Sequence, residues 1–329
     1  MDITYLLLDY PPARFIGAEL AAHRFIKWLG ARGHTVNVRL LDAESARWHE
    51  GVVARPHRTT PLAETDIVLS NAGVAERAAQ SYARYPRVVW AHNHEMPTML
   101  DVKGAHPDLV VANTEHMASV LLSTIAERGI VLYPPPAPEL PTRVATSARG
   151  DAGEWVLVNG SRSKGGALVA EVARALPDHR FLVVEGGHGT TEPDLLDVPN
   201  VSIVPQGTNM ERVWERARGL LIPSRLESYS MTGFEAAERG VGIIAHDLPG
   251  VREALGPAAT YLGTREPDQW ALTLDAWEPK VKRAAALRIS AHLSTRRADI
   301  ERQMLEVEER MLALVARARS KEDGEANHA

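Results

Sequence analysis

The chain has 329 residues, 45% of them hydrophobic, and a formal net charge of −5, which is enough material for two ordinary α/β domains. It has no cysteine, so disulfides, thiolate metal sites and cysteine nucleophiles are excluded. Neither half carries the basic excess typical of nucleic-acid binding, no apolar run approaches the ~20 residues of a membrane span, and the start MDITYLLLDYPP lacks the basic segment of a signal peptide. We therefore expect a cytoplasmic protein without a nucleic-acid or membrane signature.

The first part of the chain alternates short apolar runs with helical segments. A helix is expected from about Ala18 to Leu29. The apolar runs cover residues 5–9, 34–40, 66–70, 87–91, 108–113 and 130–133. Continuous apolar strands linked by helices predict a parallel sheet covered on both faces, and hence a Rossmann-like domain over residues 1–137.

The segment PPPAPELP (134–141) interrupts this pattern and predicts a linker over residues 138–153. A second series of apolar runs follows at 155–160, 180–187, 201–207, 219–224, 241–246 and 259–262. It predicts a second parallel-sheet domain over residues 154–290. The expected fold class is α/β, with two doubly wound Rossmann-like domains that face each other across a cleft.

The C-terminal segment has a different pattern. Apolar residues recur at steps of four and three, at Ile300, Met304, Val307, Met311 and Leu314. This stripe predicts a helix over 291–320 that packs back on the body of the protein, with a coiled-coil partner as the alternative. The polar composition of residues 321–329 predicts a disordered tail.

The stretch PSRLESYSMTGFEA (223–236) places two carboxylates eight positions apart, at Glu227 and Glu235. Glu227 falls at an expected strand-to-helix turn, and Glu235 falls within the helix. Eight helical residues return to within roughly 80° of the starting direction, so both carboxylates are expected at one crevice beside the ends of the strands. Backbone amides and hydroxyls come from the residues between them: Ser228, Tyr229, Ser230, Met231 and Thr232.

A second strand-to-helix turn, GSRSKGG (160–166), lacks the residue order of a P-loop. Its amides and Lys164 could still bind an anionic group at a helix N-terminus, although a solvated turn is the alternative. Amides and a lysine suit phosphates, and carboxylates suit sugar hydroxyls, so the two turns together suit a nucleotide sugar. The sequence has no Asp-x-Asp pair, no HExxH and no paired-histidine spacing for a metal, and we expect neither a metal nor a cofactor beside the donor.

The pattern Pro-Ser-x-x-Glu-x7-Glu-Ala resembles the signature of the family-4 retaining glycosyltransferases, which have the GT-B fold. The resemblance implies that Glu227 binds hydroxyls of the transferred sugar and Glu235 binds the ribose of the nucleotide. VNGSRSKGG resembles the diphosphate loop of that family, with Lys164 as its lysine. Further segments of the chain resemble segments of the family and occur in the same order over residues 4–262. The resemblance also implies that the first domain (1–137) binds the acceptor and that the second domain (154–290) binds the donor.

Two of these segments concern the N-terminal domain. RFIGAELAAHRFIKWLGARGHTV resembles the family's glycine loop and first helix, with Gly17 in the loop. VVWAHNHEMP resembles a strand that ends in a His-Glu pair, here His94 and Glu95. The resemblance implies an active-site role for His94, with Asn93 and Glu95 beside it on the acceptor side, whereas His92 is expected to be structural.

The chain also departs from the family pattern. Arg162 lies only two positions before Lys164, closer than the family's usual arginine, and Arg225 could substitute for it at the diphosphate. The family often has Gly-Phe-Gly where this chain has Ser228-Tyr229-Ser230, and the added side chains are expected to narrow the pocket.

The resemblance implies a hexosyl- or pentosyltransferase that uses a nucleotide-diphosphate sugar without a metal and retains the configuration of the sugar. One alternative is another GT-B enzyme, such as a nucleotide-sugar epimerase or an inverting transferase. The other is a non-catalytic protein that binds nucleotide sugars or serves as a scaffold. A protein, a lipid, a metabolite or a modified DNA base all remain open as the acceptor.

Overall fold

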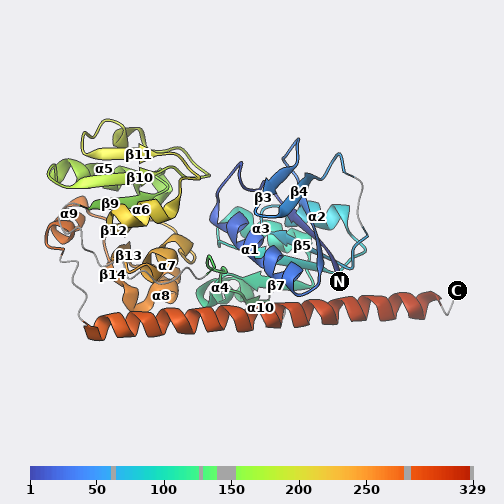
Figure 1. Ribbon diagram of the computed structural model, residues 1–329. Coiled ribbons are helices and arrows are strands. Elements are labelled where there is room, and N and C mark those ends of the chain that lie inside the picture. The colour runs from blue at the N-terminus through green and yellow to red at the C-terminus, as the bar shows by residue number, and fades with distance from the viewer. Residues whose placement is uncertain (61–63, 126–128, 139–152, 278–282, 327–329) are drawn as a thin grey trace. The chain divides into compact units, whose positions relative to one another are not determined.

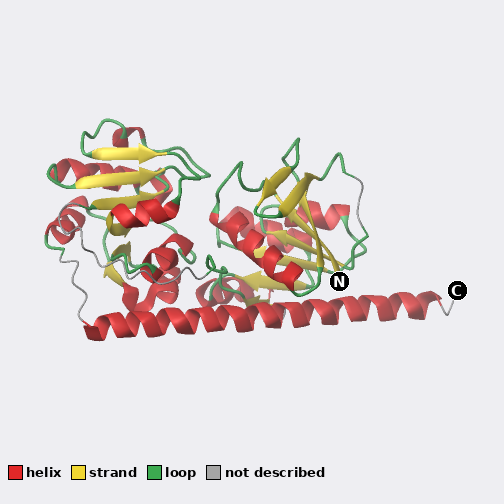
Figure 2. Ribbon diagram, viewed as in Figure 1, coloured by secondary structure: helices red, strands yellow, loops and turns green. Residues whose placement is uncertain are grey.

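The computed structural model describes residues 1–60, 64–125, 129–138, 153–277 and 283–326. The chain forms two compact units (Figure 1), of which the first is Met1–Pro135 with Ala298–Ala329 and the second is Pro136–Arg297. Each unit contains a sheet of mainly parallel strands with helices packed against it (Figure 2). The expected α/β fold class with two parallel-sheet domains is confirmed. The linker expected over 138–153 lies, except for its two end residues, outside the described residues.

The sheet of the first unit has the strand order β3-β4-β2-β1-β5-β6-β7-β8. Its strands are β1 (Asp2–Leu7), β2 (Thr35–Leu40), β3 (Arg47–His49), β4 (Val52–Pro56), β5 (Ile67–Asn71), β6 (Arg87–Ala91), β7 (Leu109–Ala112) and β8 (Gly129–Val131). The helices between them are α1 (Gly17–Ala31), α2 (Ala75–Ser81), α3 (Met96–Ala105) and α4 (Glu115–Ile125). The chain runs outward from β1 in one direction through β2 and in the other from β5 to β8. The topological switch point therefore lies between β1 and β5.

Strands β3 and β4 form a hairpin that the apolar runs do not predict. They pair antiparallel at the edge of the sheet, with Trp48 opposite Val53. The two turn residues, Glu50 and Gly51, have φ values of 42° and 88°. Two-residue hairpin turns favour positive φ because their twist matches that of the strands. The segment RWHEGVVARP escaped prediction because it has no continuous apolar run.

The second unit has the strand order β11-β10-β9-β12-β13-β14, and all of its pairs are parallel. Its strands are β9 (Glu154–Val158), β10 (Arg180–Val184), β11 (Val201–Val204), β12 (Ala217–Ile222), β13 (Ile243–His246) and β14 (Ala259–Leu262). Its helices are α5 (Gly166–Ala175), α6 (Met210–Arg216), α7 (Met231–Glu238), α8 (Pro249–Leu255) and α9 (Pro267–Asp275). Trp155, Phe181 and Trp270 are fully buried in its core. The strand order reverses between β9 and β12, which is the switch point of this unit.

Helix α10 (Arg283–Ala326) contributes its first residues to the second unit and its remainder to the first. Ile300, Met304, Val307 and Met311 are buried, whereas Leu314 is only partly buried and Val315 is buried in its place. The helix continues through residues 321–326, where composition predicts disorder, and that prediction is wrong there because lysine, glutamate and alanine are good helix formers. The end of the predicted tail, 327–329, lies outside the described residues. Among the described helices, none is both long enough and apolar enough to cross a membrane.

Candidate active site

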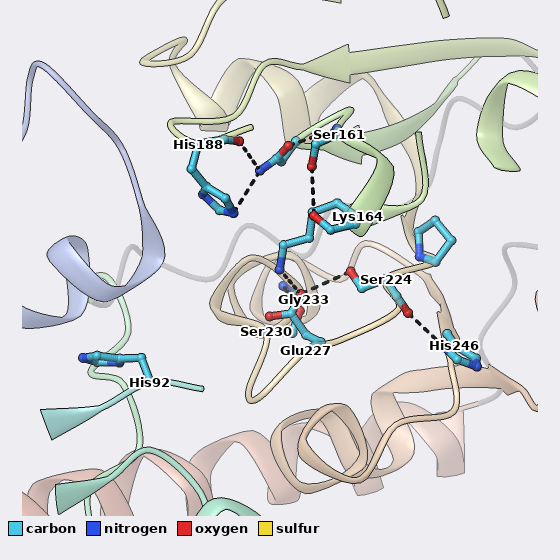
Figure 3. A network of polar contacts seen from close by, with 12 residues as sticks. His92, Ser161, Lys164, His188, Ser224, Glu227, Ser230, Gly233 and His246 are labelled. Carbon is cyan, nitrogen blue, oxygen red and sulfur yellow. Dashed lines mark hydrogen bonds and ion pairs between the residues drawn. The ribbon is translucent and has the colours of Figure 1, made fainter. Parts of the chain in front are cut away.

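The clearest polar site of the second unit joins Lys164 and Glu227 (Figure 3). The Lys164 ammonium donates to Oε2 of Glu227 at 2.7 Å, and the two side chains are 23% and 17% exposed. Lys164 follows β9 and Glu227 follows β12, which are the two strands at the switch point. A doubly wound sheet binds its ligand outside the carboxyl ends of such strands. The two side chains are 63 positions apart in the chain and meet at the place where doubly wound sheets bind their ligands.

The loops that carry these two residues are in direct backbone contact. The backbone N–H of Arg225 donates to the Ser163 carbonyl at 2.9 Å. Gly165 has a φ of 93°, and a Cβ there would lie 2.6 Å from Cγ of Pro223. Only glycine adopts this conformation at little cost and leaves room for the neighbouring loop. The approach of the two loops thus depends on the glycine of the predicted diphosphate loop.

Helix α7 begins directly after the Glu227 loop. Ser230 lies in the left-handed region at φ 79° and caps the helix, because its Oγ accepts from the Gly233 N–H at 3.3 Å. Tyr229 is buried and stacks on Phe234. The Ser230 side chain is therefore buried and engaged in the helix cap. It contributes little to the narrowing of the pocket that the sequence predicts. The first amides of α7 have no partner within the helix and offer donors to an anion.

Two residues that the sequence analysis did not select orient Glu227 through hydrogen bonds. The Ser224 hydroxyl donates to Oε2 of Glu227 at 3.3 Å, and His246 Nδ1 donates to the Ser224 carbonyl at 2.9 Å (Figure 3). His246 ends β13, the strand next to β12. Its position at a strand end in the same sheet is the signal that could have identified it.

The loop after β10 is tied to the start of the diphosphate loop through Asn159. The Asn159 side chain donates to the His188 carbonyl at 3.1 Å and accepts from the Ser161 N–H at 3.1 Å. Asn159 itself has a φ of 69°, a conformation that asparagine tolerates better than most residues. His188 is thereby brought to the same end of the sheet as Lys164 (Figure 3).

Of the two predicted arginines, Arg162 has another partner in this structure. Arg162 makes a bidentate ion pair with Glu192, at 3.0 and 3.2 Å, and its side chain is 75% exposed. Arg225 is exposed, and burial together with the Arg225 charge lowers the pKa of Arg265, which donates to the Pro223 carbonyl. Arg225 and Arg265 thus place two positive charges beside the Glu227 loop.

Glu235 lies in α7, one turn after its start, and is partly buried. Its backbone carbonyl accepts from Arg239 at 3.1 Å. Glu235 therefore lies on the helix that Ser230 caps, and Glu227 lies four positions before the first residue of that helix, Met231.

The predicted residues of the first unit lie at the carboxyl ends of its strands. His94 follows β6, and its ring lies edge-on to His116 with centroids 5.8 Å apart; its buried Nδ1 has no hydrogen-bond partner among the described residues. Asn93 accepts from the Glu95 N–H and from the Thr98 hydroxyl, so it shapes the turn into α3. Glu95 is exposed.

His92 and Gly17 complete the predicted residues of this unit. Burial lowers the pKa of His92 to about 3, so the ring is neutral at pH 7 and its role is compatible with the structural one expected. Gly17 is the first residue of α1 and is exposed.

A buried polar group at the switch point of the first unit was not predicted. Glu19, in the first turn of α1, is 7% exposed, and burial raises the pKa of its carboxyl to about 7. Asn71, at the end of β5, accepts from the Tyr5 hydroxyl at 2.9 Å. Oε2 of Glu19 and Nδ2 of Asn71 are both buried with no hydrogen-bond partner in the described part of the chain. The sequence signal was an acid within an otherwise apolar helix stripe.

The structure is similar to solved glycosyltransferases. It superposes on a sucrose-phosphate synthase from Thermosynechococcus elongatus with a TM-score of 0.73 and 14% identity, covering 96% of this chain and 99% of that one. HepE from Anabaena, in complex with UDP-glucose, matches with a TM-score of 0.67 and 16% identity over 96% and 99% of the two chains. WaaG, a glycosyltransferase involved in lipopolysaccharide biosynthesis, matches with a TM-score of 0.64 and 13% identity over 94% and 99%.

No protein-family model and no curated protein matches the sequence. At these identities the structural likeness concerns the fold. The chain has the GT-B fold of these glycosyltransferases over nearly its whole length.

Proposed function

We propose that this chain is a retaining glycosyltransferase, which moves a hexosyl or pentosyl group from a nucleotide-diphosphate sugar to an acceptor hydroxyl. The observation that carries the proposal is the 2.7 Å contact of Lys164 with Glu227 at the switch point of the second unit. An ammonium suits the diphosphate and a carboxylate suits sugar hydroxyls. The two sit together where a nucleotide sugar needs both.

The chemistry proposed for this site needs no metal. As the bond from the sugar to the diphosphate breaks, negative charge grows on the leaving oxygen. Lys164 and the first amides of α7 would stabilise that charge, which is the kind of interaction that lowers a barrier most. The ion pair with Glu227 holds the ammonium in position before the donor binds, so little reorganisation is needed.

The likeness to other transferases guides the choice of donor. HepE has been solved with UDP, with UDP-glucose, and with UDP and glucose, so UDP-hexoses are the first donors to test. On the acceptor side we propose Asn93, His94 and Glu95, with His94 as the residue that contacts the reacting groups.

The decisive experiment incubates the full-length protein with a panel of nucleotide sugars and with cell extract as the acceptor source. Mass spectrometry identifies the acceptor that gains a sugar, and NMR of the purified product gives its anomeric configuration. A product with inverted configuration would reject the retaining mechanism, and an epimerised donor would identify a different GT-B enzyme. Donor binding without any product would favour a binding or scaffold protein.

Lys164→Met should reduce turnover by about 10²–10³-fold, because one strengthened contact to the leaving group is worth roughly 3–4 kcal/mol. Initial rates at saturating donor measure this loss, and thermal unfolding of the same sample checks the fold. Lys103→Met removes an exposed lysine from α3 and serves as the matched control. Wild-type turnover in Lys164→Met would remove Lys164 from the site.

A further inference from the structure

Three side chains of the first unit with metal-binding atoms converge outside the predicted site residues. They are His23 on α1 and His49 and Glu50 on the β3–β4 hairpin. One nitrogen or oxygen from each lies within 4.8 Å of those of the others. His23 and Glu50 are 27 positions apart in the chain, a separation that no local metal motif covers, so the sequence analysis could not detect the cluster.

His23 is held in the orientation that a metal ligand requires. Its ring is 3% exposed, and its Nδ1 lies 2.5 Å from the Tyr10 hydroxyl. Glu50 Oε2 lies 3.5 Å from Nε2 and can only accept, so in the metal-free chain Nε2–H donates to Glu50 and Nδ1 accepts from the Tyr10 hydroxyl. A metal ion at Nε2 requires the other tautomer, in which Nδ1–H donates to the phenol oxygen. Metal-bound histidines are commonly oriented by such a second hydrogen bond.

The other two ligands come from the hairpin turn. Glu50 has a φ of 42°, which is uncommon for a residue other than glycine. The His49 ring lies 4.7 Å from that of His23, centroid to centroid, and its Nε2 is 4.0 Å from a Glu50 carboxylate oxygen. The Glu50 side chain is 60% exposed. The turn therefore presents two ligands to His23 and leaves one side of the cluster open to water.

An open groove lies between α1 and this hairpin. It is lined by Ile26, Lys27 and Gly30 of α1, by Val36 of β2, and by the hairpin residues Glu50–Val53 and Arg55. The ligand atoms of a tetrahedral zinc ion, bound at about 2.0–2.1 Å, lie about 3.3 Å apart. The distances from Glu50 to the two rings are 3.5 and 4.0 Å, and none of the three exceeds 4.8 Å, so the distances would have to shorten by up to about 1.5 Å. The exposed turn that carries Glu50 lies beside the open groove.

We propose that His23, His49 and Glu50 bind a divalent transition-metal ion, most suitably Zn²⁺, with water in the fourth position. Two imidazoles and one carboxylate form a ligand set that zinc uses when one position stays open. Mg²⁺ and Ca²⁺ prefer all-oxygen sites and should not compete. The ion would tie the edge hairpin to α1 and stabilise the first unit.

Lys27 opposes this binding and makes the proposal testable in both directions. Its ammonium lies 3.0 Å from Glu50 Oε2 and competes with the metal for the carboxylate. Loss of Lys27 should therefore strengthen metal binding. If Glu50 only formed hydrogen bonds and ion pairs and bound no metal, loss of Lys27 would not increase the affinity for a metal ion.

The experiment titrates Zn²⁺ into tag-free, chelator-treated full-length protein and follows binding by calorimetry and stability by thermal unfolding. We expect one equivalent to bind and to raise the melting temperature. His49→Ala and Glu50→Gln should each weaken the affinity about 100-fold or more, since even second-shell changes cost 10–100-fold. Lys27→Met should increase the affinity up to about fivefold, in line with the small energy of an exposed ion pair.

Asp275→Asn is the matched control. Asp275 lies 3.6 Å from His179 and is 70% exposed, so it forms a histidine–carboxylate pair to which the described part of the chain adds no third ligand. This substitution should leave zinc binding unchanged. Absence of stoichiometric binding, or equal binding by wild type, His49→Ala and Glu50→Gln, would overturn the proposal. Neither readout depends on sugar transfer, so the result is independent of the proposed function.

Discussion

At the scale of single residues, the contact of Lys164 with Glu227 contributes more to the site than to stability. Both side chains are about one fifth exposed, and ion pairs with solvent access contribute on the order of 0–1 kcal/mol. Its value lies in the position of the two charges. The same holds for Ser224 and His246, which orient the Glu227 carboxylate through hydrogen bonds.

Substitution of the two carboxylates should weaken ligand binding in different ways. Glu235→Gln should weaken binding of the free nucleotide diphosphate as much as binding of the intact donor, because both ligands contain the ribose. Glu227→Gln should leave free nucleotide binding almost unchanged and weaken only the donor. A charge-assisted hydrogen bond is worth about 1.5–3 kcal/mol, or about tenfold to a hundredfold, which calorimetry resolves. Wild-type binding of both ligands by both variants would show that the carboxylates have been assigned the wrong roles.

Glu19 should make stability depend on pH. Burial raises the pKa of its carboxyl in the folded chain to about 7, above the ordinary 4.5. Between these values the unfolded chain loses the proton first, so the free energy of unfolding falls as pH rises from about 4.5 to 7 and then levels off. The fall is about 3 kcal/mol, because each pKa unit corresponds to about 1.4 kcal/mol.

Glu19→Gln cannot ionise and should lack this fall. Urea unfolding at pH 5 and at pH 8 gives the free energy of unfolding of the variant and of the wild type. The difference between the two proteins should change from one pH to the other by the size of this fall. That difference is insensitive to a constant offset from new hydrogen bonds of the amide. Glu44→Gln, at an exposed acid of the same unit, is the control. A difference that does not change between the two pH values would show that Glu19 is ionised in the folded chain.

At the scale of elements, helix α8 fixes the loop that carries Glu227. A Cβ at Gly250 would lie 2.1 Å from the Ser228 carbonyl oxygen, a backbone atom that cannot rotate away. Gly250→Ala should therefore displace the loop, destabilise the protein by about 1–3 kcal/mol as overpacking does, and lower donor affinity. Calorimetry and urea unfolding measure the two effects.

Gly30→Ala is the matched control for that substitution. Gly30 lies in α1, and a Cβ there would meet nothing within 4 Å. Alanine should stabilise the helix slightly, by up to about 1 kcal/mol. Donor affinity equal to wild type in Gly250→Ala would show that the α8 contact does not position the loop.

At the scale of the whole molecule, helix α10 links the end of the chain to its beginning. The buried carboxylate of Glu308 accepts from Arg32 at 2.8 and 2.9 Å and pairs with His34 at 2.8 Å. Gln303 accepts from the Tyr133 N–H at 2.9 Å, and Arg319 pairs with Asp66 at 2.7 Å. The first unit is therefore completed by a segment that begins at Ala298, 163 positions (298 − 135) after the rest of its sequence ends at Pro135.

The second unit includes the start of the same helix. Arg297 pairs with Glu238 and donates to the Ala137 carbonyl. The division of α10 between two units explains why a linear domain assignment from sequence cannot describe its role. Local patterns report which face of a helix is apolar but not which body that face covers.

The sequence by itself determined the two-domain α/β plan, because continuous apolar runs between helices allow little but parallel sheets. It also placed Lys164 and Glu227 at strand-to-helix turns, since such turns have a local signature of an apolar run, small residues and a helix start. It missed the β3–β4 hairpin, which lacks an apolar run, and it predicted disorder where α10 continues to Ala326.

Only the tertiary structure decided which of these residues meet. Strand order brings β9 beside β12 and so brings Lys164 to Glu227, and it pairs Arg162 with Glu192. It also gathers His23, His49 and Glu50, which no spacing rule connects. The physical reason is that local propensities act over a few residues, whereas these contacts depend on the order in which strands pair and helices pack.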